Sequence, residues 1–484
     1  MEKSTFEKLP SQQDTLWTKM QKAGVELDTY TKSTLDDRDV WLGKDGEPVS
    51  RNIERERVRM QAYLEIQDPT YVQELGAFNK NLKPMSEQCR VIVSIPARFE
   101  EKNLFNLLEQ YSKQIDEHGQ PLDPNLFEID IIINRKEGES PDRSQEVISE
   151  WQATHPEYKV NAIDIEFAKE KANVGIARKY ITDLSLLRAT SRPMATGPLY
   201  VESEDADLFS VNQRTIATII KEFDEHPHLD VLAGIQDRRP DILQKNDMLF
   251  FQQRLWHFME MAMRKKKYRS DTFEQASFSW NRIMSCGWNT AYTAESYAQI
   301  GGYESAVVGE DILIGEKISL LRGQQGSDGR ITPNTLTAKS SGLRSSSSPR
   351  RIIDTMAKEV NIYDDFENQT LKQETLEDLL AKIEHYARAT QDQKSVYDDA
   401  IKKMFSFLQK EIPASESVAV LRTTLTWIGL HEDQDYTIVS GDTPSFGGLT
   451  NEGMQRIIGL FEKYREEKTY KKAYRDQNTP YEIS

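Results

Sequence analysis

The chain has 484 residues, of which 38% are hydrophobic and 29% charged, and 62 Lys and Arg against 78 Asp and Glu give a formal net charge of −16. This length predicts two to four domains, and the acidic balance argues against nucleic-acid wrapping or a general grip on anionic lipid. No apolar run approaches the roughly 20 residues that span a bilayer, and the start MEKSTFEKLPSQQD lacks the apolar stretch of a secretory signal. The two cysteines, Cys89 and Cys286, are too few for a disulfide framework or a thiolate zinc cluster. We therefore expect a cytoplasmic protein.

Residues 1–88 are polar and favour helices. Within them Ile53, Val58, Met60, Tyr63 and Leu64 are spaced as one helical face among many charges. We expect this face to dock on another part of the protein. No residue of this segment indicates chemistry.

From Val91 onward, short β-rich runs alternate with helical patterns. The runs lie at 91–95, 129–133, 160–165, 198–202 and 229–235. This alternation predicts an α/β fold, with a mostly parallel sheet that helices cover on both faces.

A Gly- and Ser-rich stretch at 322–349 predicts a mobile loop or lid with a short strand at 331–338. Beyond Ile353 the pattern is helical again. We therefore expect a helical N-terminal segment (1–88), an α/β domain (89–353) and a helical C-terminal domain (354–484).

Ligands of open α/β sheets bind at the carboxyl ends of the strands. After the first strand comes PARFEEKNL, whose acids are explained by an ordinary helix start. After the third strand, Gly175 permits a tight turn and Arg178 and Lys179 fall in the first turn of a helix, where a cation opposes the helix dipole. That cost makes sense if an anion such as a diphosphate docks there, while a solvated basic face is the alternative.

Four carboxylates, Glu202, Glu204, Asp205 and Asp207, cluster at the end of the fourth strand. Their mutual repulsion calls for a compensating charge, which a magnesium or manganese ion supplies most directly. The alternative is an acidic N-cap ahead of the next helix, a position that Ser210 could also fill.

The last cluster lies at 291–318. Gly301 and Gly302 form a flexible turn, and Glu310 and Asp311 then open an amphipathic helix. Acids at a helix start favour the dipole, and a Glu-Asp pair can also serve as a general base.

Together these motifs resemble family 2 glycosyltransferases with the GT-A fold, over about Val91–Ile318. The family's P-A-x-N-E-E is matched at 96–101 except for Phe99, and its N-x-G-x-x-x-A-R-N is echoed one residue tighter at 173–178. Its D-x-D matches Asp205 and Asp207, and its E-D matches 310–311. Its A-x7-G-G-F maps to 291–303, where nine residues separate Ala291 from Gly301 and Tyr303 stands at the Phe position.

The sequence also departs from the family pattern. The usual acidic pair after the second strand is replaced by NRKE at 134–137, which leaves the nucleotide open. Neither a Q-x-x-R-W motif nor membrane helices follow, which argues against a processive polysaccharide synthase. The stretch SSGLR at 340–344, with Arg350 and Arg351, resembles a basic tail that some members fold over the diphosphate.

The resemblance implies transfer of a sugar from a nucleotide-sugar donor to an acceptor hydroxyl, with manganese or magnesium held at Asp205 and Asp207. Asp311, with Glu310 beside it, would be the general base of an inverting reaction, although a retaining one stays open. The implied donor-binding residues are Pro96, Ala97, Arg98, Glu100, Asn134, Gly175, Arg178, Glu204 and Arg344. The implied acceptor-binding residues are Trp288, Tyr292, Gly302 and Tyr303.

The acceptor itself stays open among a glycan, a lipid-linked molecule and a small molecule, as does a homo-oligomeric state. The Met- and aromatic-rich segment at 247–269 ends in Arg264, Lys265, Lys266, Lys267 and Arg269. We interpret it as a core or interface helix with a solvated basic end, against the alternative of an approach to a lipid-linked or phosphorylated acceptor. His257 within it has no partner whose spacing indicates a metal.

Two other functions remain. A nucleotidyltransferase or sugar-phosphate enzyme could use a similar scaffold, but its G-x-G-T-R-like loop after the first strand is missing. A non-catalytic scaffold of glycosyltransferase type is the third hypothesis, and the carboxylates at both motifs argue against it.

Overall fold

The computed structural model describes residues 12–35, 38–237, 289–305, 310–327, 329, 331–334, 336–347, 393–441 and 443–466, and single positions between 251 and 262. Contacts divide the chain into two units. The first comprises Met1–Gln236 and Arg282–Ser345, and the second comprises Asp237–Asn281 and Ser346–Ser484.

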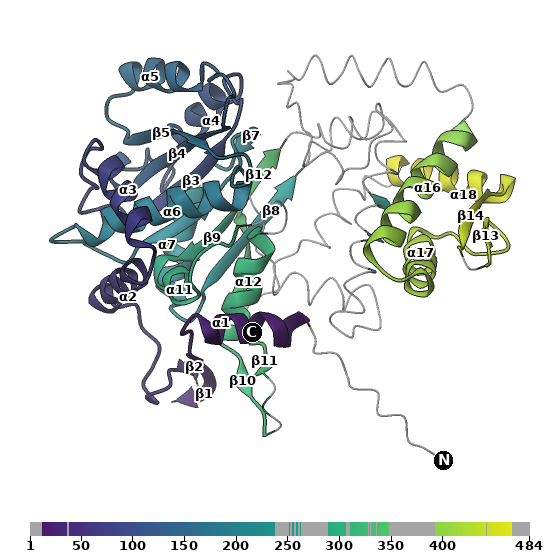
Figure 1. Cartoon of the computed structure of the whole chain (residues 1–484), viewed down its shortest axis with the longest axis horizontal. Coiled ribbons are helices and arrows are strands. Elements are labelled where there is room, and N and C mark those ends of the chain that lie inside the picture. Colours follow the sequence, from purple (N-terminus) through teal and green to yellow (C-terminus); the bar gives the residue numbers. More distant parts are fainter. Residues whose placement is uncertain are drawn as a thin grey trace. The chain divides into compact units, whose positions relative to one another are not determined.

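The first unit is built on one sheet, whose described strands follow the order β5-β4-β3-β6-β9-β8-β12-β7 (Figure 1). Strand β3 pairs in parallel with β4 and β6, and β4 pairs in parallel with β5, whereas β9 runs antiparallel to β6 and β8. The strands are β3 (Val91–Ala97), β4 (Phe127–Lys136), β5 (Val160–Phe167), β6 (Tyr200–Ser203), β7 (Leu208–Val211), β8 (Val231–Asp237), β9 (Thr290–Thr293) and β12 (Thr337–Ser347). The five predicted strands therefore correspond to β3, β4, β5, β6 and β8.

Helices follow most of these strands along the chain. In the first unit they are α1 (Gln12–Lys22), α2 (Ile53–Glu65), α3 (Pro69–Asn79), α4 (Leu104–Tyr111), α5 (Ser144–Thr154), α6 (Val174–Thr190), α7 (Thr215–Glu225), α11 (Ala294–Gln299) and α12 (Glu310–Leu321), with a short 3₁₀ turn at Pro124–Leu126. Two small antiparallel hairpins complete the unit, β1 (Thr31–Leu35) with β2 (Arg38–Leu42) and β10 (Gln324–Gln325) with β11 (Ile331–Thr332).

Strand β3 is buried on both of its faces. Val91, Val93 and Ile95 pack into one core with residues of α4, α5 and α7, whereas Ile92 packs into another core with residues of α1, α2, α11 and α12. A parallel strand needs helices on both faces to be buried in this way. The predicted fold class, an α/β fold with a mostly parallel sheet that helices cover on both faces, is confirmed.

The N-terminal helices pack within the first unit. Met60, Tyr63 and Leu64 of α2 share a core with Tyr297 of α11, which confirms that this face docks on the rest of the protein. Val58, which the helical pattern placed on the same face, is 53% exposed. The N-terminal residues 1–88 thus contribute described helices to the same compact unit as the sheet.

The prediction of a loop or lid at 322–349 is wrong over most of its described part. Residues 337–347 form β12, a strand of the central sheet. Leu343 is fully buried, and a Cβ on Gly342 would lie 2.5 Å from Thr218 Oγ1, so the strand runs close against α7. Small residues serve here for close packing, and composition alone does not distinguish that use from a flexible loop.

The second unit contains α16 (Gln393–Glu411), α17 (Ala414–Ile428), α18 (Asn451–Glu466) and the hairpin β13 (Tyr436–Val439) with β14 (Ser445–Leu449). Its core includes Phe251, Leu255, Met259 and Ala262. This stripe at helical spacing confirms a core role for that part of the segment at 247–269. His257 and the basic end at 264–269 lie outside the described residues.

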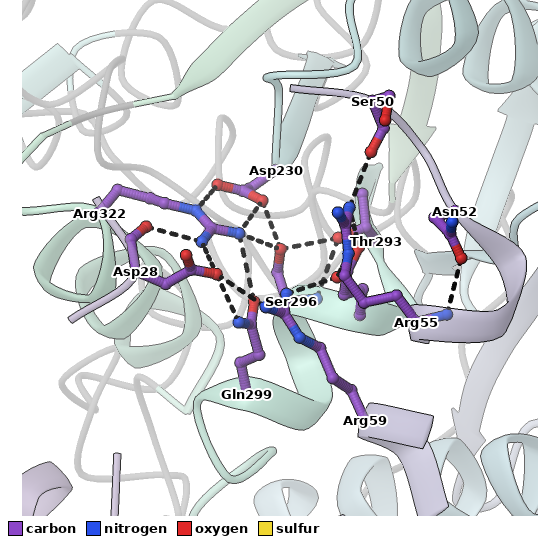
Figure 2. A network of polar contacts seen from close by, with 11 residues as sticks. Asp28, Ser50, Asn52, Arg55, Arg59, Asp230, Thr293, Ser296, Gln299 and Arg322 are labelled. Carbon is purple, nitrogen blue, oxygen red and sulfur yellow. Dashed lines mark hydrogen bonds and ion pairs between the residues drawn. The ribbon is translucent and has the colours of Figure 1, made fainter. Parts of the chain in front are cut away.

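A buried ion pair between Arg322 and Asp230 connects several elements near the amino end of β8 (Figure 2). Arg322, which follows α12, donates to Asp230 with Nε at 2.8 Å and Nη2 at 3.0 Å, and the two side chains are 1% and 0% exposed. Nη1 of Arg322 donates to the backbone oxygen of Asp28 at 2.8 Å, and Gln299 of α11 bonds both Arg322 and Asp28. The arginine also lies over the ring of Tyr30, at 4.0 Å from its centroid.

We expect Asp230→Asn to lower the free energy of unfolding by about 3–5 kcal/mol, because the change leaves the buried Arg322 without its main counter-charge. Urea unfolding followed by circular dichroism measures this. Arg143→Ala, at the exposed pair of Arg143 with Glu146, is the matched control and should cost less than about 1 kcal/mol. Equal losses in both variants would contradict a special role for the buried pair.

Candidate functional site

The predicted motifs follow strands whose carboxyl ends share one edge of the sheet. Because β3, β4, β5 and β6 are mutually parallel, the segments after them begin on the same side. Helix α6 starts there, with Asn173 as its N-cap accepting from the backbone N–H of Ile176 at 3.0 Å. Arg178 lies one turn into this helix, facing the end of β6.

Arg178 joins three of the motifs. Its Nη2 donates to Asp205 Oδ1 at 2.5 Å, and its Nε donates to Glu310 Oε1 at 3.2 Å. Its Nη1 donates to Ser203 Oγ at 2.6 Å and to the backbone oxygen of Glu204 at 3.3 Å. The side chain is 2% exposed. The guanidinium therefore fixes the end of β6 and the start of α12 against α6.

The charges of this cluster depend on one another. Burial acts to lower the pKa of Arg178, but Asp205, Tyr303 and Glu310 offset it and the pKa is raised, so the arginine stays charged. Burial, and next the charge of Asp311, raises the pKa of Glu310 to about 7. Asp311 is half-buried, and its Oδ1 accepts from the backbone N–H of Ile312 at 2.8 Å.

The four carboxylates at the end of β6 divide into two pairs. Glu202 and Glu204 are fully buried, and Glu204 Oε2 accepts from the backbone N–H of Asn289 at 2.9 Å. Burial raises the pKa of Glu202 to about 8 and that of Glu204 well above its ordinary value. Asp205 and Asp207 are half-buried on either side of the buried Ala206. Only this second pair reaches solvent.

Among the described residues, no three His, Cys, Asp or Glu side chains come together as metal ligands. Magnesium is usually bound through one or two carboxylates, with water and substrate phosphate as the other ligands. Asp205 and Asp207 supply hard oxygen atoms of this kind, although Arg178 occupies one oxygen of Asp205. The donor set fits a hard cation that arrives with a phosphate-bearing ligand.

The predicted donor-binding residues occupy the carboxyl ends of β3 and β4. Pro96 and Ala97 end β3, and Asn134 lies near the end of β4 with 8% exposure. Arg98 pairs with Glu139 and lies over the ring of Phe99, at 5.6 Å from its centroid. Phe99 has a φ of 57°, a left-handed conformation that marks a sharp turn where β3 ends.

Two further donor-binding candidates are enclosed in local structure. Glu100 is 7% exposed and accepts from Asn103 Nδ2 at 2.6 Å, a bond at the start of α4. Gly175 is buried in the first turn of α6. Arg344 lies in β12, but its side chain is outside the described residues.

Two of the predicted acceptor-binding residues, Tyr292 and Tyr303, are hydrogen-bonded to each other beside Ser203. Tyr303 donates to Ser203 Oγ at 3.2 Å, and Tyr292 donates to the hydroxyl of Tyr303 at 3.2 Å. Both tyrosines are at most 3% exposed, so their rings belong to the core and only their hydroxyls approach the polar cluster. Gly302 directly precedes Tyr303 on the loop after α11, and Trp288 lies outside the described residues.

Sequence reasoning missed three polar residues next to the site, Ser203, Asp183 and Lys317. Ser203 ends a strand as many serines do, and nothing in the pattern signals its contact with Arg178. Asp183 follows Lys179 by four residues, a spacing that brings two charges together on a helix and was visible in the sequence. Lys317 lies buried within an apolar helix, where a lone lysine was itself a signal.

Comparison with solved structures finds similar chains at low identity. A mannosyltransferase from Pyrobaculum calidifontis, solved with GDP-Man and Mn2+, is 14% identical with a TM-score of 0.35, over 78% of this chain and 93% of that one. A glucosyl-3-phosphoglycerate synthase from Mycobacterium tuberculosis, solved with Mn2+, UDP and glucosyl-3-phosphoglycerate, is 10% identical with a TM-score of 0.31, over 78% and 92%. No family model matches the chain, and no curated protein matches it. At these identities and TM-scores we assign no activity from the likeness.

In the described part of the chain, no helix has both the length and the apolar character that crossing a membrane requires.

We expect Glu310→Gln to change the pH dependence of stability. The folded pKa of about 7 lies above the ordinary 4.5, so the folded state binds the proton more tightly and loses stability as pH rises from about 4.5 to about 7. Glutamine removes this loss. Relative to the parent, the free energy of unfolding of the variant should therefore rise by about 2 kcal/mol between pH 5 and pH 8. Urea unfolding at four pH values measures it, with the exposed Glu146→Gln as control. A constant difference across that range would contradict the raised pKa.

Proposed function

We propose that the protein transfers a sugar from a nucleotide-sugar donor to an acceptor hydroxyl, with a divalent metal ion as cofactor. The observation that carries the proposal is the contact of Arg178 with both Asp205 and Glu310. Three motifs, the first and last of which lie 132 positions apart along the chain, meet there, at the sheet edge where open α/β sheets bind ligands.

The leaving group of such a reaction is a nucleoside diphosphate, so negative charge develops where the donor phosphates lie. Asp205 and Asp207 would hold manganese or magnesium, and this ion supplies positive charge to the departing phosphates. Arg178 holds the carboxylate of Asp205 in place from the protein side. The donor nucleotide would lie along Pro96 to Arg98 and beside Asn134.

The acceptor hydroxyl must lose a proton as it attacks the anomeric carbon. Asp311 would accept that proton, because its carboxylate is half-buried at the start of α12 and its neighbour Glu310 is tied to Arg178. Direct attack by the hydroxyl inverts the configuration of the sugar. The hydroxyl-bearing molecule would approach past the loop that contains Gly302 and Tyr303.

The proposal predicts separate effects for the metal and base residues. Thermal unfolding is measured with UDP-, GDP- and ADP-sugars, each with and without manganese. One donor class should stabilise the parent protein by about 2.7 kcal/mol at a hundred times its Kd, and only with the metal. Asp207→Ala should lose this stabilisation because it removes a metal ligand.

Asp311→Asn should keep the stabilisation by metal and donor but lose turnover by at least about a hundredfold, because it removes only the proton acceptor. Turnover is measured as release of the nucleoside diphosphate. Asp399→Asn, which changes an exposed aspartate that pairs with Lys403 in the second unit, should change neither quantity. A parent protein that no nucleotide-sugar stabilises would contradict the proposed donor and metal. Undiminished turnover in Asp311→Asn would contradict the proposed base.

A further inference from the structure

A buried carboxylate collects hydrogen bonds from three separate helices behind the candidate site. Asp183 of α6 is 0% exposed and accepts from the hydroxyls of Tyr63 in α2, Tyr71 in α3 and Tyr297 in α11, each at 2.9 Å at its shortest. Lys179 Nζ lies 2.7 Å from the same carboxylate. The N-terminal helices are therefore fastened to α6 through one shared acceptor.

The phenols are neutral donors in this cluster. Burial, and next the charge of Asp183, raises the pKa of Tyr63 and of Tyr297 well above the ordinary value. Hydrogen bonds and one lysine thus stabilise the buried carboxylate of Asp183. Loss of any one donor weakens this stabilisation.

Two of these phenols also touch the loop on the acceptor side. Gly302 has a φ of 71°, and a Cβ built on it would lie 2.4 Å from Tyr63 Oη and 2.8 Å from Tyr297 Oη. The backbone of Gly302 therefore rests directly on both hydroxyls. Lys317 holds the loop from another direction, with Nζ donating to the backbone oxygen of Gly302 at 3.1 Å and lying 3.0 Å from Glu304.

From this loop a chain of hydrogen bonds leads to the site. The backbone N–H of Tyr303 donates to Tyr297 Oη at 3.4 Å, and the Tyr303 hydroxyl donates to Ser203 Oγ at 3.2 Å. Ser203 Oγ also accepts from Arg178 Nη1 at 2.6 Å. The contacts run without a break from α2 to the guanidinium that binds the carboxylates of the site.

We propose that the N-terminal helix α2 positions the acceptor-side loop Gly301–Ser305 through the hydroxyl of Tyr63, which makes Tyr63 a positioning residue for the transfer reaction. The proposal rests on the proposed function for the role of that loop in the reaction, whereas the connection between α2 and the loop follows from the contacts alone. It gives the N-terminal segment, whose sequence indicates no chemistry, a part in shaping the site.

Tyr63→Phe tests the link because it removes one oxygen atom and keeps the ring. Tyr71→Phe is the matched control, since it removes a hydrogen bond to the same Asp183 carboxylate from a residue that contributes none of the three atoms nearest a Cβ on Gly302. In the full-length protein we expect the amides of residues 302–304 to exchange hydrogen about tenfold faster in Tyr63→Phe and within twofold of the parent in Tyr71→Phe.

Tyr297→Phe removes the other hydroxyl against Gly302 and should reproduce the tenfold increase, so the test does not depend on one variant folding. Unchanged exchange in the loop of Tyr63→Phe overturns the proposal. An equal rise in Tyr63→Phe and Tyr71→Phe also overturns it, because it would mean general loosening around Asp183.

A kinetic readout then separates positioning from stability. Hydrolysis of the nucleotide-sugar that stabilises the parent uses water as the acceptor. With Tyr63→Phe we expect kcat to fall about tenfold and the KM for the donor to stay within twofold, while Tyr71→Phe keeps both values. Equal kcat in the two variants overturns a role in the reaction. A parent protein that neither binds nor hydrolyses any donor sinks the proposed function instead, and the exchange rates still decide the link.

Discussion

The candidate site depends on the requirement that a buried arginine be neutralised. Arg178 is 2% exposed, and an uncompensated charge at such a position would cost several kcal/mol. Its counter-charges come from Asp205 after β6 and from Glu310 at the start of α12. The folded state therefore brings these carboxylates together before any ligand arrives. The resulting cluster has more acid than base around one guanidinium, which suits a site that gains a cation with its ligand.

The sheet and its edge could be predicted because both follow from short-range patterns. Runs such as 129–133, in which four of the five residues are isoleucine, are mostly apolar, as expected of a parallel strand buried on both faces, and polar motifs follow them directly. β12 could not be recognised in the same way. Its serines and Gly342 are small because α7 packs closely against them, and small residues are equally typical of loops.

The site itself was predictable only in part, since sequence order says which residues follow a strand but not which way they face. Glu204 and Asp205 are adjacent, yet the first is enclosed in the core and the second reaches solvent. The same holds for Tyr292 and Tyr303, whose rings fill the core while their hydroxyls approach Ser203. Contacts from distant segments, such as that of Tyr63 with Asp183, leave no local pattern beyond a tyrosine on an amphipathic face.

Helix α12 explains why the N-terminal segment belongs to the same unit as the sheet. The helix begins at Glu310, which Arg178 holds, and Arg322 follows its last turn and is held by Asp230 and Asp28. Its apolar residues Ile314 and Ile318 pack in the core that α1 and α2 also enter. Without those N-terminal helices this face of the core would be exposed, at a cost of about 25 cal/mol for each Å² of apolar surface. The segment that carries no catalytic motif therefore stabilises the helix that presents the proposed base.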